Sequence, residues 1–89
     1  MSNNLQDKNS DFVITTLDKI SVGQSCVVVR CDLPTELKIR LAEMGLVPQT
    51  KVTVVKTAPL GDPIEITVRG YSLCIRAETA KHFSVTTRQ

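Results

Sequence analysis

Apolar and polar residues alternate along much of the second half of the chain. Within residues 50–57, Val52 and Val54 fall on one face and polar side chains fall on the other. The same period of two recurs over residues 64–69 and over residues 71–76. Successive side chains of a strand point to opposite faces of a sheet, so each of these segments is predicted to be a half-buried strand.

Two further segments complete the predicted sheet. Residues 25–31 contain an unbroken apolar run from Cys26 to Val29, which is typical of a strand that is covered on both faces. Residues 83–85 are predicted to form a short last strand, after one helical turn over residues 77–81. Five strands in a chain of this size favour a small closed barrel, because closure removes the exposed edges of a sheet.

A helical period replaces the alternation over residues 32–44. The apolar residues there are spaced by four, four and three and share one helix face; they are Leu33, Leu37, Leu41 and Met44. Asp32 is predicted to cap the start of this helix through its carboxylate. Gly45 is predicted to end the helix in a left-handed conformation, with Leu46 placed to contact Leu41 as in a Schellman motif.

Composition narrows the class of protein further. A chain of 89 residues makes a single domain. Its net charge of +2 argues against a nucleic-acid surface. Its aromatic content of 3% argues against binding that stacks bases, sugars or proline-rich peptides on aromatic side chains. Residues 1–11 are polar and lack the apolar core of a signal peptide, so we predict a disordered tail before one domain over residues 12–89. No segment approaches the ~20 apolar residues of a membrane span.

One histidine and three cysteines are the candidates for chemistry. His82 could share a metal ion with Cys31, Asp32 or Cys74, or it could simply be a partly exposed residue at the start of a strand. Cys26 and Cys31 are an odd number of residues apart and face opposite sides of a strand unless a bulge intervenes. Cys26 and Cys74 are predicted to be small apolar core residues. We predict no catalytic residues, no cofactor and no built metal site, while weak binding of ferrous iron or another divalent metal remains open.

The loop over residues 58–63 has the strongest functional signal. Its sequence is Ala58-Pro59-Leu60-Gly61-Asp62-Pro63, and a proline on either side of Leu60 makes it stiff. A rigid exposed leucine is easily bound because little conformational entropy is lost, but Leu60 could equally fold back to plug the barrel end. Met44 and Leu46 pose a similar question, between helix-end core, which we favour, and the edge of a docking groove.

Two motifs in this order resemble the FeoA family of ferrous iron transport. Arg40 to Pro48 read RLAEMGLVP, and residues 58–63 are followed by IEITVRG over residues 64–70. The resemblance covers roughly residues 14–86. Gln49 departs from the family pattern, which usually has glycine after the proline, so the turn into the next strand is expected to be reshaped.

The resemblance implies a mostly β, five-stranded SH3-like barrel with one inserted helix and a short helical turn. It also implies a small cytoplasmic protein that is not an enzyme and that regulates ferrous iron uptake. Its partner would be a membrane ferrous iron permease with a cytoplasmic G domain, and contact with that permease would hold it at the inner membrane without insertion. The predicted partner-binding residues are Arg40, Met44, Leu46, Pro59, Leu60, Gly61 and Asp62. The alternatives are a metal-sensing module and, with less support from charge and aromatics, a small nucleic-acid-binding barrel; self-association remains open.

Overall fold

The computed structural model describes residues 12–88, and the predicted polar tail, residues 1–11, lies outside the described residues. The elements follow in the order β1 (Phe12–Thr16), the 3-10 helix η1 (Leu17–Lys19), β2 (Ser25–Cys31), α2 (Thr35–Glu43), β3 (Lys51–Thr57), β4 (Ile64–Val68), β5 (Tyr71–Ile75), α3 (Ala77–Ala80) and β6 (Phe83–Arg88). Among these elements, no helix is long and apolar enough to cross a membrane.

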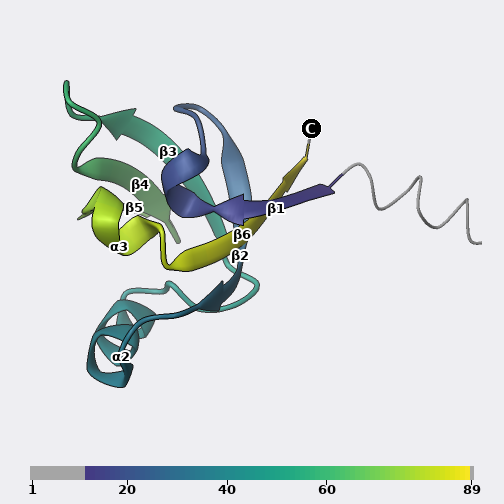
Figure 1. Cartoon of the computed structure of the whole chain (residues 1–89), viewed down its shortest axis with the longest axis vertical. Helices are drawn as coiled ribbons and strands as arrows, with labels where there is room; N and C mark the ends of the chain where they lie inside the picture. Colours follow the sequence, from purple (N-terminus) through teal and green to yellow (C-terminus); the bar gives the residue numbers. More distant parts are fainter. Residues whose placement is uncertain (1–11, 89) are drawn as a thin grey trace, which may run out of the picture.

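The six strands form one antiparallel sheet in the order β1-β6-β2-β3-β4-β5. The sheet curls around its core, with α3 and η1 packed against each other beside it (Figure 1). Within residues 12–88, strand pairing does not join the two edge strands, β1 and β5. The sheet is therefore a partly open barrel rather than the fully closed one predicted.

The sequence predicted five strands, and the sixth is β1. It pairs along its whole length with β6, from Phe12 opposite Arg88 to Thr16 opposite Ser84, and this pairing also makes β6 longer than the predicted 83–85. Ile14 in β1 is 70% exposed, so the strand has no clear inward apolar face. Residues 12–16 form a strand because their backbone pairs with the distant strand β6. Their own hydrophobic pattern does not predict a strand.

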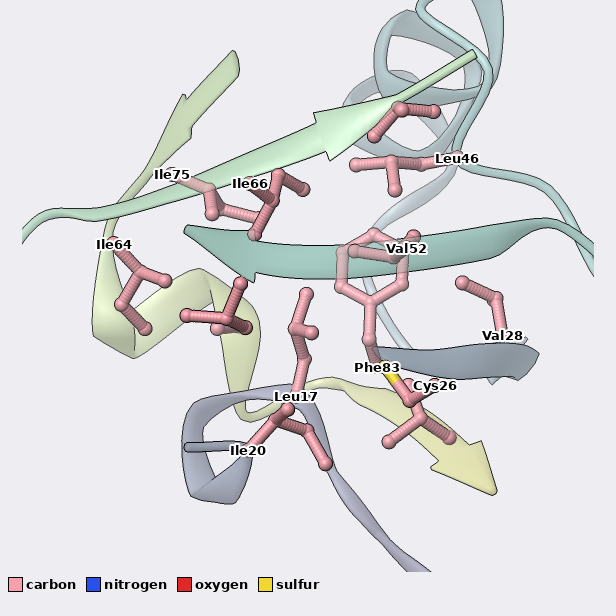
Figure 2. Packing of buried hydrophobic residues seen from close by; sticks show 14 residues of the cluster. Leu17, Ile20, Cys26, Val28, Leu46, Val52, Ile64, Ile66, Ile75 and Phe83 are labelled. Atoms are coloured by element: carbon pink, nitrogen blue, oxygen red, sulfur yellow. The ribbon is translucent and has the colours of Figure 1, made fainter. Parts of the chain in front are cut away.

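The alternation predicted for the central strands is confirmed by the core. Figure 2 shows the buried side chains gathered between the curled strands and η1, with Phe83 near the middle. The buried apolar residues are Leu17, Ile20, Cys26, Val28, Leu46, Val52, Val54, Ile64, Ile66, Val68, Ile75, Ala80, Phe83 and Val85. Apolar burial of this kind is the main force that stabilises a small domain.

Helix α2 begins later than predicted. Its N-cap is Pro34, and no side chain caps it, so the prediction that Asp32 caps the helix is wrong. Asp32 instead donates its backbone N–H to the carbonyl of His82 at 2.8 Å, which ties the end of β2 to the start of β6. The residue before a proline favours extended backbone, so Pro34 keeps the preceding residue out of the helix.

The end of α2 is confirmed as a Schellman motif. Leu46 donates its backbone N–H to Leu41 at 3.0 Å, and Gly45 donates to Ala42 at 2.9 Å. Gly45 has a φ of 100°, a conformation that side chains disfavour. The motif turns the chain back toward the sheet, while none of the nine residues of α2 is buried and the helix lies at one end of the molecule (Figure 1).

Candidate partner-binding surfaces

The residues predicted to bind a partner do not form one surface. Arg40 and Met44 belong to the end of the molecule formed by α2, which we call the α2 end. The β3–β4 loop, which contains Leu60, lies at the opposite end of the long axis (Figure 1); we call it the Leu60 loop. One flat contact cannot cover both ends of the barrel.

Leu60 points into solvent, so of the two alternatives left open by the sequence the outward one holds and the plug is wrong. Its exposed fraction is 95%. The loop around it is closed by two backbone hydrogen bonds, from Gly61 to Ala58 at 2.7 Å and from Ala58 to Pro63 at 3.0 Å. Leu60 is thus an exposed apolar side chain on a backbone that is already ordered, which lowers the entropy lost on binding.

Asp62 anchors the Leu60 loop to α3. Its Oδ1 accepts a hydrogen bond from the backbone N–H of Ala77 at 2.9 Å, which satisfies one of the free amides at the start of that helix. Its Oδ2 lies 3.8 Å from a guanidinium nitrogen of Arg76, an exposed pair of the kind that contributes little. Asp62 therefore has a structural role in addition to any role in recognition.

The α2 end is attached to the barrel just after the helix. Leu46 is 3% exposed and Met44 is 39% exposed, so the core interpretation is confirmed for Leu46 and wrong for Met44. The Tyr71 hydroxyl donates a hydrogen bond to the Met44 carbonyl. A Cβ on Gly45 would lie 3.1 Å from Cδ of Arg69, so the side chain of Arg69 extends over this glycine. A buried Leu46 side chain is not accessible to a partner.

Of the three cysteines, Cys26 lies in the core as predicted, whereas Cys31 and Cys74 are placed differently. A bulge between Val28 and Arg30 shifts the register of β2 against β6, so Cys31 packs against the core as the buried Cys26 does, and the two do not face opposite sides. Cys74 is exposed, which corrects its predicted place in the core. Leu73 and Ile75, on either side of it, occupy the inward positions of β5.

His82 is half-buried at the start of β6, and its backbone N–H donates to Thr79 at 3.0 Å. Within the described part of the chain, no three His, Cys, Asp or Glu side chains are grouped so as to hold a metal ion. Burial raises the pKa of the Cys26 thiol from its ordinary 9.0 to about 11, because a thiolate loses its hydration there. That thiol is an inert core group rather than a nucleophile.

A polar groove of about 490 Å³ lies beside the ends of β3 and β4, and the sequence did not single it out. Its lining residues are Gln49, Thr50, Lys51, Thr53, Thr67 and Arg69. Gln49 has a φ of 78° and Arg69 a φ of 51°, in the left-handed region that favours glycine. The turn at Gln49 keeps its closing hydrogen bond, from Thr50 to Val47 at 3.2 Å. The glutamine therefore holds a backbone conformation that favours glycine.

The FeoA domain matches this sequence over residues 15–87. The chain belongs to the FeoA family. It is 33% identical over 69 residues to a Fe(2+) transport protein A/Fe(2+) transporter FeoB fusion protein of Porphyromonas gingivalis. The match covers 78% of this chain and 8% of the fusion protein, so the chain spans less than a tenth of that relative.

Solved FeoA structures share the fold. FeoA of Chlorobium tepidum is 32% identical with a TM-score of 0.79, and the match covers 82% of this chain and 70% of that one. FeoA of Stenotrophomonas maltophilia, solved in complex with zinc and described as a prokaryotic SH3 domain protein, is 28% identical with a TM-score of 0.70. That match covers 83% of this chain and 96% of the other. The predicted SH3-like fold and FeoA membership are confirmed.

The two motifs that carry the FeoA resemblance lie at the two ends of the barrel. Residues 40–48 run from the last turn of α2 into the turn before β3, and residues 58–63 form the Leu60 loop. The sequence analysis placed residues of both motifs in one predicted set of partner-binding residues. Only the path of the backbone shows that Leu46 turns inward and Leu60 turns outward.

Proposed function

We propose that this FeoA chain is an accessory protein of ferrous iron uptake that works by contact with a membrane ferrous iron permease. The observation that carries the proposal is the fusion protein, in which a FeoA region and the FeoB transporter share one chain. A covalent link keeps two modules at high effective concentration. In this chain, we propose that surface residues of the FeoA domain make the same association.

We further propose that the contact is made with the cytoplasmic, G-domain-containing part of the permease, and that FeoA is a cytoplasmic regulator rather than an enzyme. Strongly shifted pKa values tend to gather at catalytic sites. Burial raises the pKa of the Cys26 thiol, and this thiol is enclosed in the core, away from any substrate. This arrangement supports a role in binding rather than in catalysis.

The Leu60 loop is the proposed primary contact, formed by residues Pro59 to Asp62. Leu60 supplies exposed apolar area, and the hydrogen bonds of the loop and of Asp62 hold it in one conformation. Arg40 and Met44 at the α2 end form a separate second candidate. Because the two regions lie at opposite ends (Figure 1), a partner that uses both must wrap around the barrel or contribute two segments.

The proposal is tested by titrating the full chain into the isolated cytoplasmic part of the cognate permease, with GDP, with a non-hydrolysable GTP analogue and without nucleotide. Saturable binding is expected, and Leu60→Ala should weaken it about tenfold, as for a central apolar anchor. Ile14→Ala is a matched control, because Ile14 is also an exposed aliphatic residue but lies on β1, outside both candidate surfaces. Dependence on nucleotide identifies a regulator of the G domain, and absence of binding to this part contradicts the proposal.

A metal-sensing role is the second candidate, and one contact favours it. The backbone hydrogen bond from Asp32 to the His82 carbonyl joins the two segments that carry Cys31, Asp32 and His82, although among the described residues these side chains are not grouped as a metal site. We would measure thermal stability under anaerobic conditions with and without ferrous iron, in the wild type and in His82→Ala. Stabilisation of the wild type that the variant lacks would support this role, because a ligand that binds the native state raises its stability. No stabilisation of the wild type would end it.

A further inference from the structure

Two residues of the chain hold backbone conformations that their side chains disfavour. Pro48 and Gln49 occupy the centre of the Val47–Thr50 turn, and Gln49 has a φ of 78°, where a type II turn favours glycine. Arg69 and Gly70 form a two-residue hairpin loop with φ values of 51° and 90°, where a type I′ turn favours asparagine and glycine. Such strained residues tend to persist at functional sites.

Both strained residues line the same groove, together with Lys51. Val52 lies opposite Val68 in the β3–β4 ladder, so the next positions outward place Lys51 and Arg69 across from each other. Like charges that face each other across two strands are destabilising. Of the ion pairs formed within residues 12–88, none includes either of these cations. The groove therefore carries positive charge that the described part of the chain does not neutralise.

A row of hydroxyl groups extends from the groove across the outer face of the sheet. Its members are opposite one another in the strand registers, in the order Ser25, Thr53, Thr67 and Ser72. Ser25 and Thr53 already share a hydrogen bond of 2.8 Å. The row crosses four strands, a width of about 14 Å. That width matches roughly four residues of extended peptide. The row therefore suits an extended segment rather than a single small ion, and we call it the polar track.

None of the residues that the structure describes in the lining of the groove is acidic. Glu65, the acidic residue of β4, lies opposite Lys56 in the β3–β4 ladder, so a basic residue of the chain stands next to it. The side chain of Arg69 lies over Gly45, where a Cβ would come within 3.3 Å of Nε. Gly45 thus leaves the space in which this arginine lies beside the groove.

We propose that this polar track binds an acidic, extended segment of a partner protein, with carboxylates at Lys51 and Arg69 and backbone or polar groups on the hydroxyl row. A longer acidic segment gains from both cations and displaces water along the row. A small free anion would stay largely hydrated, because the exposed cations are well screened. Nucleic acid is disfavoured by the lack of aromatic side chains among the lining residues. The surface is distinct from the Leu60 loop, so the proposal goes beyond the contact proposed above.

The experiment is a titration of the full ¹⁵N-labelled chain with an octaglutamate peptide at about 20 mM salt, where screening is weak. Amide shifts are expected to concentrate at residues 25, 49–53, 67–69 and 72 and to weaken as salt is added. Arg69→Asn should weaken binding about threefold to fivefold, and the double variant with Lys51→Gln about tenfold. Lys56→Gln is the matched control, since Lys56 is an exposed lysine of the same strand with Glu65 opposite, and it should change binding less than twofold.

Arg69→Asn also separates recognition from folding. Asparagine suits a type I′ turn better than arginine does, so the variant should melt at the wild-type temperature or above it. A marked fall in melting temperature would show that Arg69 is retained for packing against the α2 end, and would overturn the proposal. Equal shifts with inorganic phosphate would indicate a point-anion site, and equal shifts with oligothymidylate a nucleic-acid surface. Either result would overturn the acidic-segment proposal, as would shifts spread over all the lysines.

Discussion

The α2 end and the Leu60 loop carry similar sequence features and have opposite structures. At the α2 end, Gly45 turns the chain back to the sheet, and the leucine after it is 3% exposed. In the loop, the leucine before Gly61 is 95% exposed, because the hairpin tip projects beyond the sheet (Figure 1). An apolar residue beside a glycine is therefore buried where the sheet lies close enough to pack against it. It is left exposed, and free to contact a partner, where the chain projects beyond the sheet.

The largest expected effect on stability comes from truncating the two leucines, one at each end. Leu46→Ala should lower the free energy of unfolding by about 3 kcal/mol, since it removes a fully packed core side chain. Leu60→Ala should change it by less than about 0.5 kcal/mol, because an exposed side chain loses little packing. Urea unfolding of both variants checks this. A large loss for Leu60→Ala would show that the loop packs onto the barrel in solution.

A pair of glycine substitutions tests the space around the two turns. Gly45 and Gly61 have φ values of 100° and 85°, so alanine at either position costs about 1 kcal/mol of backbone strain. At Gly45 the new Cβ would also lie 3.1 Å from Val68 and Arg69, whereas at Gly61 nothing lies within 4 Å. We expect a total loss of about 2 kcal/mol for Gly45→Ala and about 1 kcal/mol for Gly61→Ala. Equal losses in urea unfolding would contradict the close contact at the α2 end.

Two side-chain hydrogen bonds fasten the two ends. Asp62→Ala removes the acceptor for the Ala77 amide and should cost about 1 kcal/mol, as loss of a helix cap does. Tyr71→Phe removes the donor to the Met44 carbonyl and should cost about 0.5–1 kcal/mol. Amide exchange should accelerate in α3 for the first variant and in α2 for the second. Faster exchange throughout the sheet would mean that these bonds support the whole barrel.

A buried thiol tests the core that lies between the two ends. Burial raises the pKa of Cys26 from 9.0 to about 11, so the folded state keeps the thiol protonated where the unfolded state releases its proton. The stability that depends on this difference is complete below pH 9 and is lost as the pH rises towards 11. At about pH 9.5 the wild type should lose roughly 0.5–1 kcal/mol relative to pH 8. In urea unfolding, Cys26→Ala should not show this pH-dependent loss of unfolding free energy, whereas Cys74→Ala should still show it.

Much of the barrel could be predicted because burial and local pattern agree there. In β4, Ile64, Ile66 and Val68 are buried in alternation, as their spacing indicates. The Schellman end of α2 was predictable as well, because glycine at that position has few other uses. In these places the local sequence and the final contacts favour the same structure.

The features that the sequence did not predict depend on distant partners. The strand β1 exists through pairing with β6, and its own residues alternate weakly. The place of Cys31 depends on a bulge in β2, which has no reliable local signal. The groove at Gln49 and Arg69 could have been suspected, since Gln49 follows a proline in a turn and Arg69 precedes a glycine in a hairpin. Its charge became visible once the strand register brought Lys51 across from Arg69.

The place of β6 in the sheet has a consequence for the order in which the protein can be made. A ribosome releases β1 to β5 before β6, yet β6 is hydrogen-bonded between β1 and β2 and brings Phe83 and Val85 to the core. The strands β2 to β5 can pair with one another during synthesis, but β1 stays apart from them until the last strand arrives. The nascent chain therefore exposes apolar strands that chaperones recognise, and stop codons a few residues early in this strand would leave it in that state.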